Sequence, residues 1–297
     1  MFDVTIVGCG DIGLRVARRW QERGHRVTAC SRSAERLAQL AAAGLSTCAL
    51  DLDVPPAAAP TPPLADTLVY YFVPPPADGQ SDPRMACFID HLEGALIRGQ
   101  RPWAVVLLGT TGIYGDQAGR LVNEDTPPNP QTDRGRRRLD AETRLRDFGH
   151  RHGITVVTLR VGGIYDRERL PLARIRRGTP LLHEHLAPQT NRIHADDLAA
   201  VCVAAGEKAR ADAVYNVSDG QDSNMTEYFF TIADCLGLPR PPTVDWDEAE
   251  TLLSAGMLSY LRESRRLDTR RMREELGVEL GYPDLRSALA RMFGKHG

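Results

Sequence analysis

The sequence lacks several features that would assign a protein to a class at once. No apolar run approaches the roughly 18 residues that a membrane-spanning helix needs. The six cysteines include no C-x-x-C pair, which argues against zinc ligands and disulfides and predicts buried thiols. A net charge of −2 argues against a dedicated nucleic-acid binder, and the chain has no internal repeat. The first predicted strand starts almost at the N-terminus, which leaves no room for a signal peptide, so we expect a cytoplasmic protein.

Three glycines at fixed spacing follow that first strand. Gly8, Gly10 and Gly13 form the pattern G-x-G-x-x-G at the start of a predicted helix. Gly8 permits a tight turn, Gly10 lets a pyrophosphate approach the backbone, and Gly13 lets helix and strand pack closely. The first helical residues, Asp11 and Ile12, lie where free N–H groups would face the phosphates. The pattern predicts a dinucleotide site, and a glycine turn without a ligand is the alternative.

The end of the second predicted strand indicates which dinucleotide binds. Sites that prefer NAD place Asp or Glu about 20 residues beyond the glycines, to bind the ribose 2′-OH. This chain has Arg32 there, between the hydroxyls of Ser31 and Ser33. A guanidinium offers a 2′-phosphate a charged fork of donors, so we expect NADP(H). A solvated arginine at a strand end is the alternative.

The order of predicted elements indicates an α/β fold. Strands and helices alternate through the first half, and a further strand over residues 213–217 brings the total to about seven. Such alternation predicts a Rossmann-type, doubly wound parallel sheet with right-handed crossovers. We expect residues 1–167 to form the dinucleotide-binding domain, with residues 193–220 returning to it. Residues 168–192 and 221–297 are expected to form a small, mostly helical substrate domain, with the substrate cleft between the two.

Five segments in order resemble motifs of one enzyme family. They are residues 109–116, 123–127, 160–165, 192–199 and 215–220. Together they are similar to the extended short-chain dehydrogenases/reductases, of the NAD(P)-dependent epimerase/dehydratase type. The resemblance covers residues 1–220 and implies the extended form of the Rossmann fold.

The family's catalytic Y-x-x-x-K motif is missing from this chain. The aligned stretch has Arg134 in the tyrosine position and Arg138 in the lysine position, and no tyrosine lies between Tyr114 and Tyr165. Arginine cannot replace the phenol as a base, because it does not deprotonate near neutral pH. The chain therefore resembles the atypical members, which keep the cofactor site and have an incomplete catalytic set.

The resemblance implies roles for other residues. Thr110 aligns with the hydroxyl that hydrogen-bonds the substrate oxygen, although it could equally be a strand-end hydroxyl within a turn. Arg138 would hold the nicotinamide ribose, and Tyr114 or a bound water would relay the proton. Tyr165 is the other nearby phenol, and a packed loop aromatic is the alternative for both tyrosines.

The same resemblance places more of the cofactor site. Asp51 and Leu52 end the third strand, where relatives contact the adenine, and Val73 ends the fourth, on the nicotinamide side. His183 and His185 have no definite third ligand, so we expect no metal site.

These observations predict an NADP(H)-dependent oxidoreductase, or an epimerase/dehydratase-type enzyme, that acts on a carbonyl or alcohol group of a small molecule. The arginine run at residues 134–138 could face an anionic substrate. A non-catalytic NADP(H)-binding redox sensor is the alternative, and both a monomer and a homodimer remain open.

Overall fold

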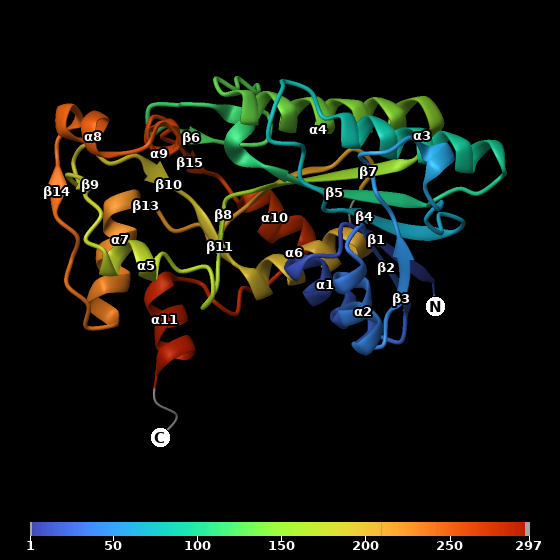
Figure 1. Cartoon of the computed structure of the whole chain (residues 1–297), viewed down its shortest axis with the longest axis horizontal. Helices are drawn as coiled ribbons and strands as arrows, with labels where there is room; N and C mark the ends of the chain where they lie inside the picture. Colours follow the sequence, from blue (N-terminus) through green and yellow to red (C-terminus); the bar gives the residue numbers. More distant parts are fainter. Residues whose placement is uncertain (1, 209, 295–297) are drawn as a thin grey trace.

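A seven-stranded parallel sheet forms the centre of the structure (Figure 1). The computed structural model describes residues 2–208 and 210–294. In spatial order, the strands are β12 (Val214–Val217), β7 (Thr155–Val161), β5 (Ala104–Thr110), β4 (Thr67–Tyr71), β1 (Asp3–Val7), β2 (Arg26–Ser31) and β3 (Ser46–Ala49). Each neighbouring pair runs parallel. The expected Rossmann-type α/β fold is therefore confirmed.

Helices cover both faces of the sheet, which explains why most residues of its inner strands are apolar. One face packs against α1 (Asp11–Glu22), α2 (Ala34–Ala42), α6 (Ala195–Lys208) and α10 (Arg270–Leu276). The other face packs against α3 (Pro83–Ile97) and α4 (Asp133–His152). All five residues of β4 are buried between these two layers.

A second lobe, which we call the cap, lies beyond the carboxyl ends of the strands (Figure 1). Its helices are α5 (Leu172–Arg176), α7 (Met225–Cys235), α8 (Trp246–Leu252), α9 (Ala255–Leu261) and α11 (Leu285–Phe293). Its short strand pairs are β9 (Leu181–Leu182) with β14 (Thr243–Val244), and β10 (Gln189–Thr190) with β13 (Ser223–Asn224). The pair β8 (Gly163–Tyr165) with β11 (Arg192–His194) adjoins both lobes, because Ile193 packs in the core of the sheet domain and Tyr165 in that of the cap.

Loops within the sheet domain and between the lobes contain the remaining elements. These are the 3-10 helices η1 (Pro56–Ala58) and η2 (Thr111–Tyr114), and the strand pair β6 (Leu121–Val122) with β15 (Arg266–Leu267).

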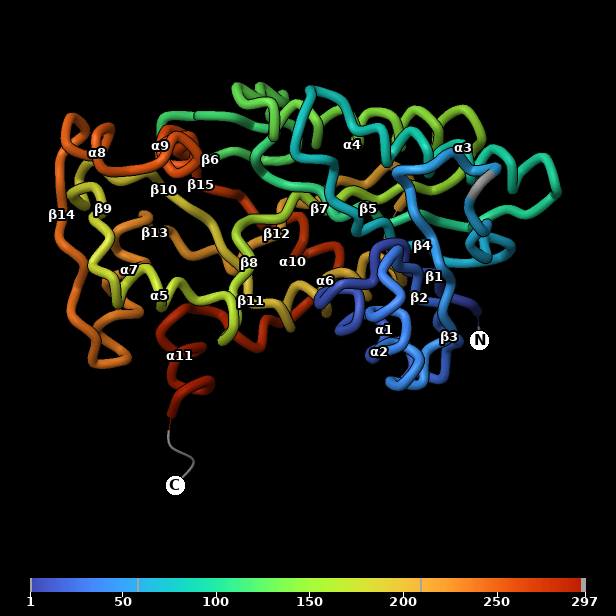
Figure 2. Tube along the Cα trace, viewed as in Figure 1, coloured from blue at the N-terminus to red at the C-terminus, as the bar shows by residue number. Residues whose placement is uncertain are grey.

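One helix that we assigned to the cap belongs to the sheet instead. Helix α10 contacts α6 and β12 (Figure 2). Its Met272 and Leu276 are completely buried in the same hydrophobic cluster as β1 and α6. The expectation that all residues after 221 form the cap is therefore wrong for α10, because its two apolar residues complete the core on this face of the sheet.

Two further expectations can be compared with the structure. No helix in the described part of the chain combines the length and the apolarity needed to cross a membrane. Four of the six cysteines are buried thiols, as expected. Cys48 is only half-buried, and Cys235 is exposed because it is the last residue of α7 and lies at the protein surface.

A buried ion pair joins helix α4 to the sheet. Arg160 Nη2 on β7 donates to Glu142 Oε1 on α4 at 2.6 Å, and Arg160 Nη1 donates to the Tyr114 hydroxyl at 2.8 Å. That hydroxyl donates in turn to Asn216 Oδ1 on β12 at 2.8 Å. Because the side chains of Arg160 and Glu142 are almost completely buried, the charge of each is compensated by the other rather than by water.

Breaking this pair should strongly destabilise the protein. Arg160→Met leaves the Glu142 carboxylate buried without a counter-charge, so we expect a loss of about 3–5 kcal/mol in the free energy of unfolding. The double variant Arg160→Met/Glu142→Leu should recover most of that loss. Urea denaturation measures both.

The control removes an exposed ion pair from the same helix. Arg144→Met breaks the contact between Arg144 and Asp140 and should cost less than about 1 kcal/mol. Equal losses for Arg160→Met and Arg144→Met would contradict the importance of the buried pair.

Candidate functional site

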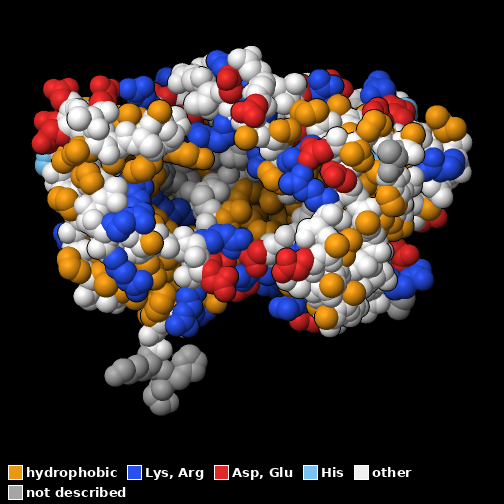
Figure 3. Space-filling view, viewed as in Figure 1, with side chains coloured by type: hydrophobic (Ala, Val, Ile, Leu, Met, Phe, Trp, Pro, Cys, Tyr) orange, Lys and Arg blue, Asp and Glu red, His pale blue; other side chains and the backbone are white. Residues whose placement is uncertain are grey.

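Two cavities lie at the carboxyl ends of the sheet strands, and Figure 3 shows the hollow between the two lobes. The first, of about 380 Å³, follows β1, β2, β3 and β4, and we call it the glycine-loop cavity. The second, of about 400 Å³, lies between β5, β7 and the cap, and we call it the cap cavity. The lining of each cavity indicates what it could bind.

The glycine loop has the geometry that a dinucleotide requires. Gly8 has a φ of +87°, and a Cβ there would lie 2.7 Å from Val73 Cγ2. A Cβ at Gly10 would meet nothing within 4 Å, so this position opens onto the cavity. A Cβ at Gly13 would lie 3.2 Å from Ile6 Cγ2, because α1 packs closely against β1. The three positions therefore fit a tight turn, a close approach of a pyrophosphate, and close packing of helix on strand.

Most of the predicted cofactor residues come together here. Those that line the glycine-loop cavity are Gly8, Gly10, Ser31, Arg32, Asp51, Leu52 and Val73. Asp11, Ile12 and Gly13 do not line it. Gly13 instead serves the close packing of α1 on β1, and the contact of Asp11 and Ile12 with the cofactor stays a prediction. The Asp11 carboxylate pairs with Arg15 and Arg169, and Ile12 is buried in the core.

Two arginines that the sequence analysis missed also line this cavity. Arg36 reaches back from α2 and donates to the carbonyl oxygens of Cys9 and Gly10, at 3.0 and 2.8 Å. Arg84, in the first turn of α3, donates to both oxygens of Asp53 at 2.6 and 2.8 Å. Arg32 contacts the same carboxylate at 2.5 Å, and the hydrogen bonds from Arg84 hold the pKa of Asp53 below its usual range. Neither arginine was identified from the sequence, because the contact of each with the cavity depends on how its helix packs against the sheet.

Thr110 faces the cap cavity from the end of β5. Its Oγ1 accepts a hydrogen bond from the Gly112 N–H at 3.2 Å. A hydroxyl is both acceptor and donor, so the Thr110 O–H remains able to donate to a ligand oxygen.

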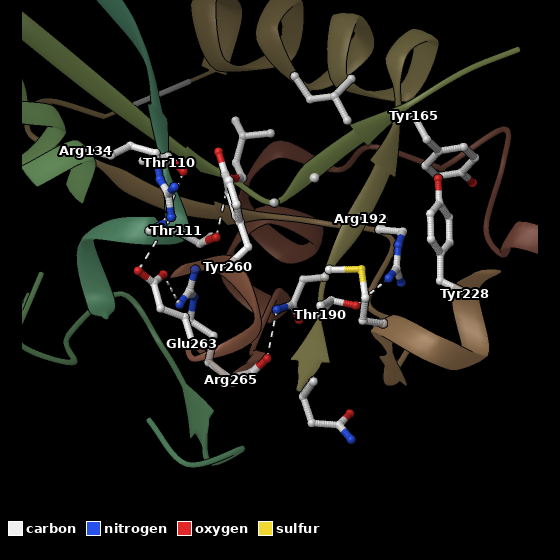
Figure 4. Close-up of a pocket in the computed structure, with 18 residues that line it drawn as sticks. Thr110, Thr111, Arg134, Tyr165, Thr190, Arg192, Tyr228, Tyr260, Glu263 and Arg265 are labelled. Carbon is white, nitrogen blue, oxygen red and sulfur yellow. Dashed lines mark hydrogen bonds and ion pairs between the residues drawn. The ribbon is translucent and has the colours of Figure 1, made fainter. Parts of the chain in front are cut away.

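Arg134, in the tyrosine position of the family motif, lines the same cavity from the first turn of α4. The close approach of α4 to η2 depends on Gly135, where a Cβ would lie 3.0 Å from the Gly112 carbonyl oxygen. Arg134 is thereby held close to Thr110 (Figure 4).

A tyrosine of the cap, Tyr260, lies beside Arg134 in the cap cavity. Tyr260, on α9, lines the cavity and is 55% exposed. The guanidinium carbon of Arg134 lies 3.7 Å from the centre of its ring, a cation–π contact. Figure 4 shows Tyr260 beside Arg134 and Thr110. Sequence reasoning missed Tyr260, because only the packing of α9 against the cleft brings it next to α4.

Two other predicted catalytic residues do not line the cap cavity. Tyr114 is 0% exposed, and its hydroxyl is occupied by Arg160 and Asn216, so its expected place in the cleft is wrong. Burial also raises the pKa of Tyr114, which disfavours the phenolate. Arg138 lines neither cavity and approaches the Leu108 carbonyl oxygen at 3.5 Å. Its role at the ribose stays a prediction.

The open space at Gly10 generates a testable difference between two glycines. Gly10→Val should abolish dinucleotide binding and leave the unfolding midpoint near that of the native protein, since its side chain would fill only the cavity. Gly8→Val should lower the midpoint, because it places a branched side chain at positive φ against Val73. Calorimetric titration with NADPH and thermal unfolding measure the two effects. Undiminished binding by Gly10→Val would mean that this loop holds no pyrophosphate.

Comparison with known proteins extends this picture. A conserved protein from Silicibacter pomeroyi DSS, described as functionally unknown, is 29% identical, with a TM-score of 0.82 over 98% of each chain. MoeE5 in complex with UDP-glucose and NAD is 23% identical, with a TM-score of 0.73 over 98% of this chain and 97% of its own. The human epimerase family protein SDR39U1 (isoform2) with NADPH is 19% identical, with a TM-score of 0.71 over 98% of each chain.

The last two likenesses concern the fold alone. The sequence pattern of a whole family, however, matches residues 4–218, which include the glycine loop, Thr110 and Arg192. This confirms the resemblance noted from the motifs: the chain belongs to the NAD dependent epimerase/dehydratase family.

Proposed function

We propose that this protein binds NADP(H) and acts as an oxidoreductase on a carbonyl or alcohol carbon of a small molecule. The arrangement of the two cavities carries the proposal. Val73 follows β4 in the glycine-loop cavity, and Thr110 ends the neighbouring strand β5 in the cap cavity. A dinucleotide seated over Gly10 would thus extend toward Thr110. When bound, the nicotinamide supplies the hydride chemistry.

Three arginines support a preference for NADP(H) over NAD(H). Arg32, Arg36 and Arg84 line the glycine-loop cavity together with the carboxylates of Asp51 and Asp53. The excess of positive charge suits a 2′-phosphate, to which guanidinium groups donate in forked pairs. The structural neighbours include one complex with NAD and one with NADPH, so the proposed preference rests on the arginines alone.

Within the cap cavity, Thr110 and Tyr260 are the groups suited to the substrate oxygen. The Thr110 hydroxyl, held in place by the Gly112 N–H, would donate to that oxygen and polarise the carbonyl. The Tyr260 phenol would pass a proton to it, the task of the tyrosine that α4 lacks. Arg134 positions this phenol through its ring and is itself held by Glu263, at 3.6 Å.

Because the chain has no cysteine pair bonded in the described residues, we place it in the reducing cytoplasm. A redox sensor that binds NADP(H) without turnover is the second candidate, and one observation favours it: α4 carries Arg134 where the family has its catalytic tyrosine.

The cofactor preference can be tested with two arginines at opposite ends of β2. Arg32→Gln should weaken NADPH binding by about 2–3 kcal/mol, the scale of a charge-assisted contact, and leave NADH binding nearly unchanged. The matched control is Arg26→Gln, because Arg26 also pairs with an aspartate, Asp3, and lies far from the cavity. Fluorescence titration gives both affinities. If native protein bound NADH as tightly as NADPH, the preference would be refuted.

The chemical roles can be tested by NADPH oxidation against a panel of aldehydes, ketones and keto-sugars. Tyr260→Phe should lower kcat by roughly 10²–10⁴-fold with little change in KM, since it removes only the proton. Thr110→Val should lower kcat/KM. Tyr282→Phe, a cap tyrosine outside the cavity lining, serves as control and should keep native activity.

The outcomes separate the two candidates. Turnover that is unaffected by both Thr110→Val and Tyr260→Phe would contradict the site assignment. Tight NADPH binding without turnover of any compound would favour the sensor.

A further inference from the structure

Arg192 occupies the end of the cap cavity that lies away from Thr110 and Arg134 (Figure 4). It belongs to β11, and its guanidinium carbon lies 3.8 Å from the centre of the Tyr228 ring on α7. The residue is only 8% exposed, although it lines the cavity. Its charge is therefore held away from bulk water and next to a space that a ligand could occupy.

The guanidinium has no acidic partner among the residues that the structure describes. Nη1 donates to Ser223 Oγ at 2.6 Å, and Nη2 donates to Thr190 Oγ1. These two contacts use two of the five donors of an arginine. Burial lowers the pKa of Arg192 to about 10, so the group is still a cation at neutral pH.

The carboxyl groups around Arg192 do not pair with it, although Asp219, Asp222, Glu227 and Asp284 line a smaller pocket together with Arg192. Asp219 forms no ion pair with Arg192 and instead accepts a hydrogen bond from the Gln221 N–H. Burial raises the pKa of Asp219 to about 6, so the carboxyl is still largely ionised at neutral pH and attracts Arg192 without contacting it. A buried cation without a carboxylate partner is costly, so a ligand anion at this place would be favourable.

The other arginines of the cavity differ from Arg192 in this respect. Arg265 pairs with Glu263 at 3.0 Å, and Arg134 shares the same carboxylate at 3.6 Å. Of the described arginines that line the cavity, Arg192 is thus the one that forms no ion pair, although Asp219 and Glu227 lie near enough to attract its charge. A ligand would find here a guanidinium that no carboxylate of the described residues contacts directly.

We propose that Arg192 binds a carboxylate of the substrate, so that the substrate class is a keto acid or the corresponding hydroxy acid. A single cation matches a monoanion, and the planar guanidinium matches the geometry of a carboxylate. The substrate would have its reacting oxygen beside Thr110 and Tyr260 and its carboxylate beside Arg192. This inference rests on the proposed function for the reacting end of the molecule, but the binding of the carboxylate does not require turnover.

Two pairs of compounds test the charge alone. Benzoylformate is compared with benzoylformamide, and levulinate with levulinamide, because each acid and its amide have nearly the same shape. Calorimetric titration into native protein, with and without NADP⁺, should give at least one acid about tenfold or more tighter binding than its amide. In Arg192→Gln that preference should disappear.

Arg174→Gln is the matched control. Arg174, on α5 of the cap, has no acidic partner among the residues described and is stacked on the Phe229 ring at 4.9 Å, but it does not line the cavity. This variant should keep the full preference for the acid. Thermal unfolding of both variants checks that each is folded, and Arg192→Lys, which keeps the charge, should retain part of the preference.

Any of three results would overturn the proposal. Native protein could bind each acid no more tightly than its amide, or bind neither acid at all. The preference for the acid could also survive in Arg192→Gln. The affinity for NADPH, measured on the same samples, separates failure of the carboxylate site from failure of the proposed function. Native NADPH binding without acid preference refutes only the carboxylate site. Acid preference without NADPH binding refutes the proposed function and leaves the carboxylate site standing.

Discussion

The parallel direction of all seven central strands is the constraint on which the site depends. Every carboxyl end lies at one edge of the sheet, so loops that are distant in sequence meet there. The order of strands also reverses at β1, whose neighbours are β2 on one side and β4 on the other. Helices α1 and α3 consequently lie on opposite faces, and a crevice opens between them at this edge. Gly8 and Gly10 lie in that crevice because β1 ends there.

Ion pairs between arginines and carboxylates link the elements that surround the two cavities. In the glycine-loop cavity, Arg32 and Arg84 converge on Asp53. In the cap cavity, Arg134 and Arg265 converge on Glu263. The second cluster joins α4 of the sheet domain to the segment after α9 of the cap, so the arginine that replaces the family's tyrosine helps to hold the cap in place. Arg134 also contacts the ring of Tyr260, and this cap tyrosine therefore lies beside the residue that stands in the position of the family's tyrosine.

Local patterns allowed much of the fold and half of the site to be predicted. Apolar strands alternating with helices were enough for the sheet, and the glycine spacing was enough for the turn at Gly8 and the opening at Gly10. Residues defined by distant contacts could not be found this way. Arg84 lies 31 residues from the Asp53 that orients it. Sequence proximity to the cleft also misled: Tyr114 follows Thr110 closely, yet its hydroxyl is bound by Arg160, 46 residues further on.

The measurement that tests the central claim most directly is a crystal structure of the protein grown with NADP⁺. The account predicts a 2′-phosphate among Arg32, Arg36 and Arg84, a pyrophosphate over Gly10, and a nicotinamide ring that reaches Thr110. It also predicts that Tyr260 still faces the space above that ring. A dinucleotide bound elsewhere, or one whose nicotinamide lies away from Thr110 and Tyr260, would contradict it.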